Sequence, residues 1–310
     1  MSSYGEIAYR RPTKSPRDAR VEQLYVEREF APGVSGKAGL FLMPFGLLNQ
    51  NHEPTAYHGV TRNYVDTAII PTTWREVGLG LSGSTASGLG WDVGLTTGFN
   101  LTKWDPTSPE GREGPLRATH SEGQFAAARD LSVYGALNWR GVPGLLIGGA
   151  VFTGMVGHQT AGFEANDSTL LLLDVHAWYQ FGGWDLSAQY ANGAFGHTEA
   201  LNRSFLANHI ATPTLVPSRF YGGYVQAAYK LWRRQDYVLL PFARNERFNT
   251  AAGYGALSAA EGGSPTADEQ VWSLGASPRI GEGVVLKADY QKFHLDRARD
   301  QLNLGMGYSF

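Results

Sequence analysis

Apolar and polar residues alternate with a period of two over much of this chain. The last ten residues place polar residues or glycine on one face and apolar residues on the other, namely Leu302, Leu304, Met306, Tyr308 and Phe310. Ten residues is the length at which a tilted strand crosses a bilayer, and alternation gives such a strand one lipid face and one water face. Residues 91–100, 130–140, 184–190 and 284–291 repeat the pattern. The alternation therefore predicts membrane-spanning β-strands.

Fourteen such strands are predicted along the chain. They lie near residues 2–10, 20–30, 36–43, 74–83, 89–100, 129–140, 144–155, 169–181, 183–192, 218–231, 236–247, 269–280, 283–293 and 300–310. The strand of residues 89–100 carries Trp91, Val93, Leu95, Thr97 and Phe99 on its outward face. An even number of strands lets the last strand pair with the first and removes exposed sheet edges.

The predicted connections fall into two classes. Those after even-numbered strands are short and rich in glycine, near residues 31–33, 83–88, 141–143, 182–183, 233–235 and 281–283, whereas most others are long: 44–73, 101–128, 156–168, 193–217 and 248–268. Short turns at one end and long loops at the other are typical of outer-membrane barrels with periplasmic termini. We therefore predict an all-β fold, a transmembrane antiparallel up-and-down β-barrel of 14 strands, forming a single domain over residues 1–310. The alternative is a large soluble β-sandwich, whose strands also alternate.

Composition supports the barrel and narrows the function classes. Aromatic residues recur on the outward face near strand ends, as girdles at the two membrane interfaces do: Trp91, Trp139, Tyr179, Trp184, Tyr190, Tyr221, Tyr229 and Phe310. The chain has no cysteine, which excludes disulfides and thiolate metal sites. A net charge of -2 leaves no basic footprint for a nucleic-acid partner. No apolar run is long enough for a transmembrane helix, and the first residues lack the features of a signal peptide, so we expect a mature or recombinant chain.

Several separate segments carry a family resemblance. They are AGLFLMPFGLLN at 38–49, HEP at 52–54, GVTRN at 59–63, IIPTTW at 69–74, GVPGL at 141–145, VLKADYQ at 285–291 and GMGYSF at 305–310. From about residue 21 to the end, the chain resembles the outer-membrane porins related to the phosphate-selective porin O and P family. The resemblance implies a bacterial outer-membrane location, a homotrimer as candidate assembly, and an assembly signal at Phe310.

The chain departs from that family in one respect. Its relatives have sixteen strands, with a further strand pair between the opening strand and the segment that matches residues 21–30. Here Arg20 leads directly into Val21. A hairpin is therefore absent relative to the family, by nature or by engineering, which leaves the pore width and the oligomer contacts of those strands open.

A porin acts through the charges that line its lumen. By strand parity we expect pore-lining side chains at Glu76, Asp92, Asp174, His176, Asp185, Arg244, Arg279, Lys287 and Asp289. The inward set also contains the acids Glu27, Glu29 and Asp130 and the bases Lys37, Arg140 and Lys230. Phosphate selectivity in the family is attributed to arginine rows and a lysine cluster, whereas the six lysines here lie mostly on separate segments.

These residues predict a water-filled, weakly selective channel for small hydrophilic solutes and ions, neutral to slightly cation-preferring. Its other contacts would be the lipid bilayer and lipopolysaccharide, and no cofactor is expected. The alternatives are an anion- or phosphate-selective porin and a barrel scaffold that sheathes a partner.

The long connection 44–73 is the candidate constriction. Loops of this length usually have a role, and its apolar residues Tyr64, Val65, Ile69 and Ile70 should be buried, either inside the lumen or outside as a lid or subunit contact.

Two further kinds of site were weighed. His176 and Asp174 share a lumen face and could act as a base with a serine such as Ser132 or Ser187, but nothing fixes that geometry, so we do not expect an enzyme. The loop histidines have no short ligand spacing, so no metal site is expected: His52, His58, His120, His158, His197 and His209.

Overall fold

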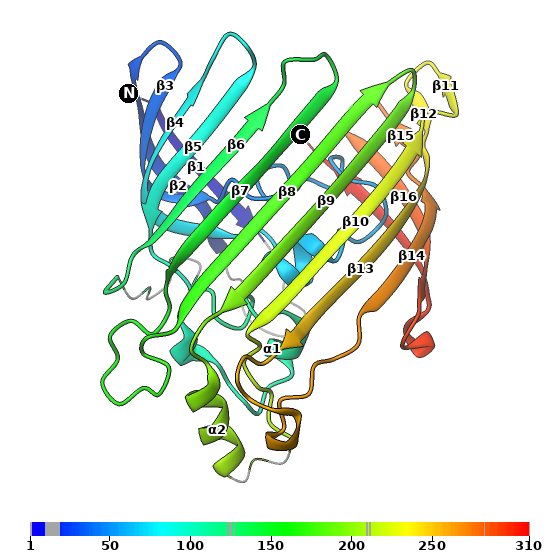
Figure 1. The fold of residues 1–310 in the computed structure, drawn as a ribbon. Helices are drawn as coiled ribbons and strands as arrows, with labels where there is room; N and C mark the ends of the chain where they lie inside the picture. Colours follow the sequence, from blue (N-terminus) through cyan, green and yellow to red (C-terminus); the bar gives the residue numbers. More distant parts are fainter. Residues whose placement is uncertain are drawn as a thin grey trace.

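The computed structural model describes residues 2–9, 19–121, 123, 126, 128–208, 210, 212–281 and 283–309, with side chains from residue 21 onward. The described strands form one antiparallel sheet that curves into a β-barrel around an internal loop (Figure 1). Phe310, predicted to lie at the periplasmic rim, is outside the described residues. No helix among the described residues is both long and apolar enough to cross a membrane.

The strands match the predicted segments closely. Their bounds are β1 Ser2–Tyr9, β2 Ala19–Ala31, β3 Val34–Leu42, β4 Arg75–Ser84, β5 Leu89–Thr96, β6 Ser132–Trp139, β7 Leu145–Met155, β8 Thr169–Phe181, β9 Trp184–Phe195, β10 Arg219–Tyr229, β11 Trp232–Arg234, β12 Tyr237–Leu239, β13 Pro241–Gly253, β14 Glu269–Ala276, β15 Arg279–Ile280, β16 Val284–Phe293 and β17 Gln301–Tyr308. The helices are short: η1 Val65–Ile69, η2 Leu101–Lys103, α1 Glu110–Glu113, α2 Glu199–Ala207, η3 Ala259–Glu261 and η4 Arg297–Arg299.

The described residues form seventeen strand segments where fourteen strands were predicted. The difference comes from three short segments, β11, β12 and β15, each separated from β10, β13 or β14 by one or two residues. Two of these breaks involve proline, Pro241 and Pro278, which has no N–H to donate to a ladder. The three segments therefore extend long strands, and fourteen long strands remain.

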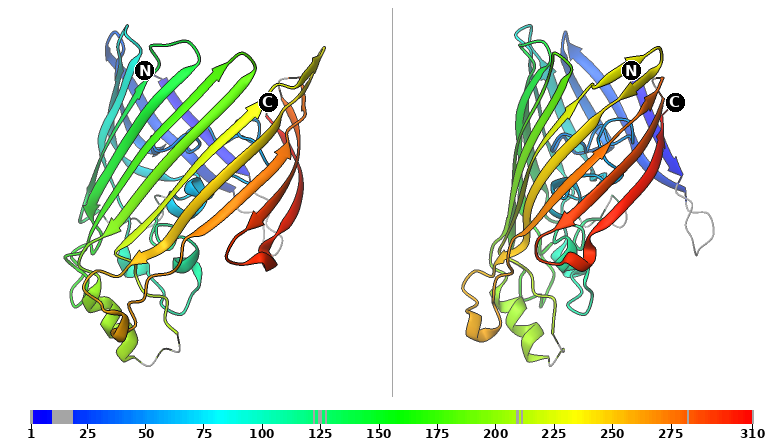
Figure 2. Two further views of the ribbon diagram at one scale, coloured as in Figure 1. Left: turned by 45° about the vertical axis from the view of Figure 1, so that its right-hand side comes forward. Right: turned by 90° about the vertical axis from the view of Figure 1, so that its right-hand side faces the viewer.

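Each long strand pairs with the next long strand along the chain, so that β10 pairs with β13 and β14 with β16, and every pairing from β1 with β2 to β16 with β17 is antiparallel. The turn between β8 and β9 has only two residues, Gly182 and Gly183, both with positive φ. Figure 2 shows such short turns at one end of the barrel and long connections at the other, as predicted. Among the pairings of the described residues there is no ladder between β17 and β1, so their pairing stays a prediction.

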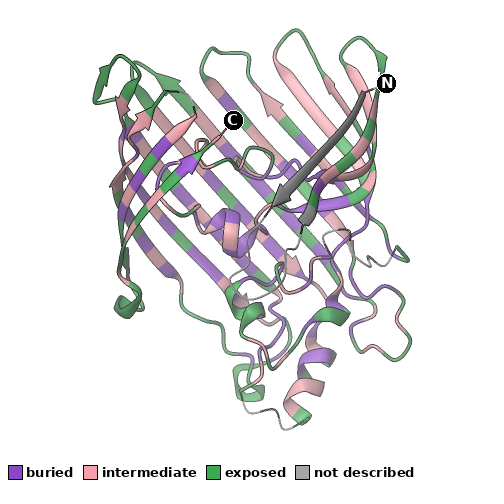
Figure 3. Cartoon of the chain, turned by 180° about the vertical axis from the view of Figure 1, so that it is seen from behind, coloured by how far each residue is buried: buried purple, intermediate pink, exposed green. Residues whose placement is uncertain are grey.

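The outward face is the predicted apolar one. Along β8, Leu171, Leu173 and Val175 are exposed, while the intervening residues 170, 172, 174 and 176 are buried. Figure 3 shows such alternating bands of buried and exposed residues along the strands. The outward residue Leu304 is 75% exposed on β17. The aromatic residues predicted for the girdles include four exposed ones: Tyr179, Trp184, Tyr190 and Tyr229. Because a water-soluble protein would bury these side chains, the surface is suited to lipid.

The interior is more apolar than we predicted. Phe99 was placed on the outward face of a strand over residues 89–100, but β5 ends at Thr96 and Phe99 is fully buried. Its ring lies 5.1 Å from that of Trp74 and 5.6 Å from that of Phe152. The chain leaves the sheet after β5, and the long connections need an apolar interior against which to bury their own hydrophobic residues.

Candidate functional site

The connection between β3 and β4, residues 43–74, lies inside the barrel, and we call it the constriction loop. Of the two positions predicted for this loop, inside the lumen or outside as a lid or subunit contact, the structure shows the first. Its helix η1 packs against β9, β10 and β13, and Val65 and Ile69 are fully buried there. The apolar residues of the loop thus cover the inner wall instead of forming an outer lid.

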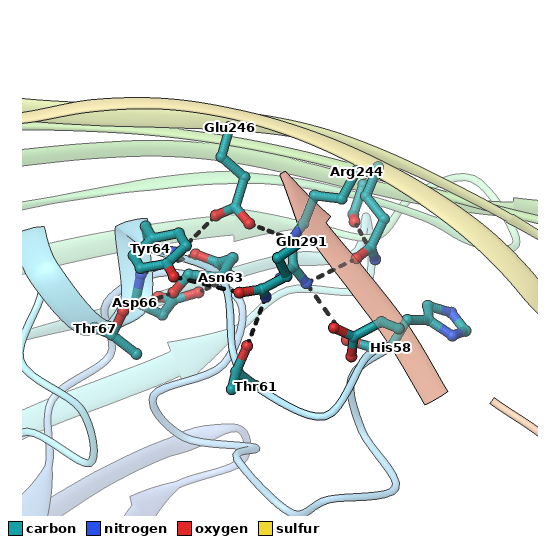
Figure 4. A network of polar contacts seen from close by, with 12 residues as sticks. His58, Thr61, Asn63, Tyr64, Asp66, Thr67, Arg244, Glu246 and Gln291 are labelled. Atoms are coloured by element: carbon teal, nitrogen blue, oxygen red, sulfur yellow. Dashed lines mark hydrogen bonds and ion pairs between the residues drawn. The ribbon is translucent and has the colours of Figure 1, made fainter. Parts of the chain in front are cut away.

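Carboxylates of the wall accept hydrogen bonds from backbone N–H groups of the loop. Gly46 N donates to Asp174 Oδ1 at 3.3 Å, and Val60 N donates to Asp289 Oδ2 at 2.6 Å. A third bond runs from Tyr64 N to Glu246 Oε2 at 2.5 Å (Figure 4). Irregular backbone inside a membrane barrel needs such partners, because its polar groups cannot all bond within the loop.

Bases of the wall bond the loop carbonyls. Arg279 Nη2 donates to Thr55 O at 3.1 Å, Lys287 Nζ to Tyr57 O at 2.9 Å, and Arg244 Nη1 to His58 O at 3.4 Å. The Lys287 ammonium also lies 3.5 Å from the centre of the Tyr57 ring, a cation–π contact. Bases and acids of β8 to β16 together hold a loop that contributes mainly its backbone.

A fully buried ion pair of the wall joins Arg244 and Glu246. The Nε–Oε1 distance is 2.6 Å, and both side chains are no more than 2% exposed. Figure 4 shows the pair beside Gln291, whose Nε2 donates to Thr61 Oγ1 at 2.9 Å. Our prediction missed Glu246. This residue lies two positions after Arg244 on β13, so its side chain points to the same inner face.

His176 and Asp174 do form a pair. The distance from His176 Nδ1 to Asp174 Oδ1 is 2.6 Å, but Nε2 lies 2.9 Å from the amide oxygen of Asn138. Among the hydrogen bonds of the described residues, neither Ser132 nor Ser187 contacts the imidazole. The arrangement therefore fixes the ring to the wall and brings no hydroxyl nucleophile to it.

The other three predicted residues lie elsewhere on the wall. Glu76 accepts hydrogen bonds from Trp74 Nε1 at 3.0 Å and Thr97 Oγ1 at 2.6 Å. Asp92 lies 2.7 Å from Lys37 Nζ and also accepts from the Tyr134 hydroxyl at 2.7 Å. Asp185 accepts from Trp178 Nε1 at 2.7 Å and lies 3.6 Å from His58 Nε2. The nine predicted residues thus face inward but do not converge on one point.

Two loop residues have perturbed acidity. The pKa of His52 is raised, chiefly by its hydrogen bond to Glu22, whose carboxylate lies 2.6 Å away. Burial raises the pKa of Asp66 to about 6, and the nearby Asp174 carboxylate adds to the effect. Asp66 accepts hydrogen bonds from Asn63 Nδ2 at 2.7 Å and Gln189 Nε2 at 3.3 Å, which oppose the rise.

The loop packs closely against one part of the wall. Between it and β8, β9, β10 and β13 lies a cavity of about 40 Å³, lined by residues that include Tyr57, His58, Trp178 and Asp185. Such a volume holds a few water molecules at most.

The loop also presents exposed polar residues, among them Gln50 and Glu53. Among the described residues, no group of three or more histidine or acidic side chains could hold a metal ion.

Comparison with known proteins identifies the fold. No protein-family model matches the chain. An uncharacterized protein of Aquifex aeolicus (strain VF5) is 28% identical over 274 residues, which cover 87% of this chain and 60% of that protein. The chain therefore spans about three fifths of the length of the curated relative that it matches.

Solved structures are similar over nearly the whole chain. OmpF of Salmonella typhi, solved in complex with daunomycin, has a TM-score of 0.63 and 16% identity, covering 99% of this chain and 85% of that one. The outer-membrane channel DcaP of Acinetobacter baumannii has a TM-score of 0.55 and 11% identity, covering 99% and 80%. OprB of Pseudomonas putida has a TM-score of 0.52 and 11% identity, covering 94% and 72%. The chain therefore has the β-barrel fold of the outer-membrane porins.

Proposed function

We propose that this protein is a passive diffusion channel of a bacterial outer membrane, for small hydrophilic solutes and ions. The observation that supports this most strongly is the constriction loop, which is bonded to the inner wall through its backbone inside a barrel with a lipid-suited surface. A loop held in this way narrows the lumen while its exposed side chains meet the permeating water.

We place the water-filled passage between the constriction loop and strands β3 to β5. Most of the loop anchors given above lie on β8, β9, β13, β15 and β16. On β3 and β5, by contrast, Lys37 and Asp92 are half-buried and bond each other. A half-buried ion pair at such a position lies beside the permeating solute. The passage would also be lined by the loop residues Gln50 and Glu53.

Weak selectivity follows from how the charges are used. Asp174 and Asp289 oppose Arg244, Arg279 and Lys287, and all five are engaged with the loop or with one another. Their fields nearly cancel, and bonded charges act weakly on a passing ion. Exposed or half-buried acids such as Glu27, Glu29 and Glu53 then favour cations slightly.

One observation favours the alternative of an anion- or phosphate-selective channel. The guanidiniums of Arg62, Arg244 and Arg279 all lie close enough to Lys287 to repel its ammonium. If the loop moved away from the wall, Arg62 would leave with it, and Arg244, Arg279 and Lys287 would form a basic surface on the wall able to receive a phosphate.

Planar-bilayer recording distinguishes these functions. Under a KCl gradient we expect a small reversal potential of cation-preferring sign, without block by added phosphate. Strong anion preference with block at low phosphate would instead establish the anion-selective alternative. Absence of conductance from correctly folded protein would establish a closed scaffold and refute the channel.

A further inference from the structure

Two inward positions of the last strand, Gly305 and Gly307 of β17, carry no side chain. Leu304 and Met306, which alternate with them, point outward and are 75% and 73% exposed. Glycine inside a strand is unfavourable, because it loses more conformational freedom on folding than other residues and adds no side chain to the packing. Such a glycine often marks a place where another part of the chain comes close to the strand.

The part of the chain that comes close here is the constriction loop. A methyl group added at Gly305 would lie 2.9 Å from Val60 Cγ1, and one added at Gly307 would lie less than 3.0 Å from Pro54 Cβ. Carbon atoms in ordinary contact are about 3.5–4.0 Å apart. A change of rotamer relieves neither contact easily, because the proline ring fixes its own Cβ and valine is stiff at χ1. Even an alanine at either position would therefore lift the loop by roughly 1 Å.

Strand β16 holds the same stretch of the loop through its inward side chains. Lys287 pairs with Gly305 and donates to Tyr57 O at 2.9 Å. Asp289, two residues further along, accepts from Val60 N at 2.6 Å. An N–H···O hydrogen bond needs its donor and acceptor within about 3.2 Å, so both contacts require the loop backbone to lie close to the hairpin. The bare backbone of β17 gives the loop the space to come that close.

We propose that Gly305 and Gly307 are positioning residues of the channel, which let the constriction loop lie flat on the β16–β17 hairpin and thereby set the width of the passage. The inference rests on the proposed channel function and deepens it. A side chain that lifts the loop off β17 pushes it toward the middle of the lumen. Because the loop forms one side of the passage, such a shift narrows it.

The contacts allow each glycine to be tested with its own rescue. Gly307→Ala and Gly305→Ala each lift the loop at one point. Pro54→Gly removes the atom that the new methyl group of Gly307→Ala meets, and Val60→Ala does the same for Gly305→Ala. Gly90→Ala is the matched control on the inner face of β5, because among the described atoms the nearest to its new methyl group would be a backbone oxygen at 3.7 Å.

Single-channel conductance in planar bilayers measures the width. Gly307→Ala and Gly305→Ala should each lower the conductance by about a third or more, since roughly 1 Å is a large part of the width of a narrow pore. Gly90→Ala should match the wild type, although it adds the same volume to the inner wall. Gly307→Ala with Pro54→Gly, and Gly305→Ala with Val60→Ala, should each recover the wild-type conductance.

Hydrogen–deuterium exchange of peptides from residues 54–61 measures the position of the loop without a conducting channel. Lifting the loop stretches the bond from Val60 N to Asp289, so protection should fall in both alanine variants and return in the two rescued variants. All measurements use the folded full chain. If Gly307→Ala does not fold, Gly305→Ala tests the same contact between loop and strand.

Three results would overturn the proposal. They are conductance and protection equal to the wild type in the alanine variants, a loss of conductance that the rescuing substitutions do not reverse, and a rise in conductance. The second result would mean that the added methyl group acts on the strand itself, and the third that the loop does not move into the passage. A wild-type protein that does not conduct would refute the channel, whereas the exchange measurement would still test how the glycines hold the loop.

Discussion

Asp66 makes docking of the constriction loop depend on pH. The residue is 3% exposed, and burial raises the pKa of its carboxyl group from 3.8 to about 6 when the loop is docked. The docked loop therefore holds the proton more tightly than the released loop does. The stabilisation of docking by this proton is fully present below pH 3.8 and is lost as the pH rises through about 6. A shift of this size corresponds to about 3 kcal/mol between the two limits.

Asp66→Asn removes the titrating group. Near pH 8, where Asp66 is charged, the variant loop should be more firmly docked than the wild-type loop by up to about 3 kcal/mol. Near pH 4 the two loops should be nearly equal, because the wild-type carboxyl is then protonated. Part of the gain is lost if the new amide cannot match the hydrogen bonds from Asn63 and Gln189.

Hydrogen–deuterium exchange of peptides from residues 60–70 measures this docking. After correction for the intrinsic pH dependence of exchange, wild-type protection should fall between about pH 4 and pH 6.5 and change little above that, whereas protection in Asp66→Asn should stay constant. Glu53→Gln is the control, since it neutralises an exposed acid of the same loop and should behave like the wild type. Equal pH dependence in Asp66→Asn and the wild type would refute the reasoning.

Three further predictions test the wall and the passage. Leu286→Arg on the lipid face should reduce the free energy of unfolding by about 2–4 kcal/mol. Ser82→Arg on the inner face should change that free energy little. Equal effects of the two variants in urea titrations would contradict the assigned strand parity. Arg244→Met should cost about 3–5 kcal/mol because it leaves Glu246 buried without its partner, and Arg244→Met with Glu246→Leu should recover part of that loss in the same titration. Glu53→Lys should shift the reversal potential under a KCl gradient toward anion preference with unaltered stability, and an unchanged potential would place Glu53 outside the passage.

The sequence predicts the barrel wall well because one physical rule controls it. A strand between lipid and an enclosed lumen must alternate, so the parity of Leu171, Leu173 and Val175 could be assigned without a structure. The breaks beside Pro241 and Pro278 could have been predicted too, since each proline removes one ladder donor. The end of β5 could not, because Thr97 and Phe99 continue the alternation after the chain has left the sheet.

The candidate site is harder to predict than the wall. Strand parity gives the direction in which Arg244 or Asp289 points, but their partners are backbone groups of residues far along the chain, at His58 and Val60. Backbone N–H and C=O groups are the same for every residue type, so they leave no mark in the sequence. The prediction of weak selectivity therefore treated the inward charged side chains as free, whereas the constriction loop occupies many of them.

The same anchoring has an evolutionary consequence. Because the wall binds the constriction loop through main-chain groups, exposed loop side chains such as Gln50 and Glu53 can be exchanged with little effect on how the loop is held. A lineage could thus retune which solutes pass by single substitutions while the barrel and its assembly stay constant. For the same reason, the loop offers protein engineers positions at which a pore can be given a new charge or size without redesign of its frame.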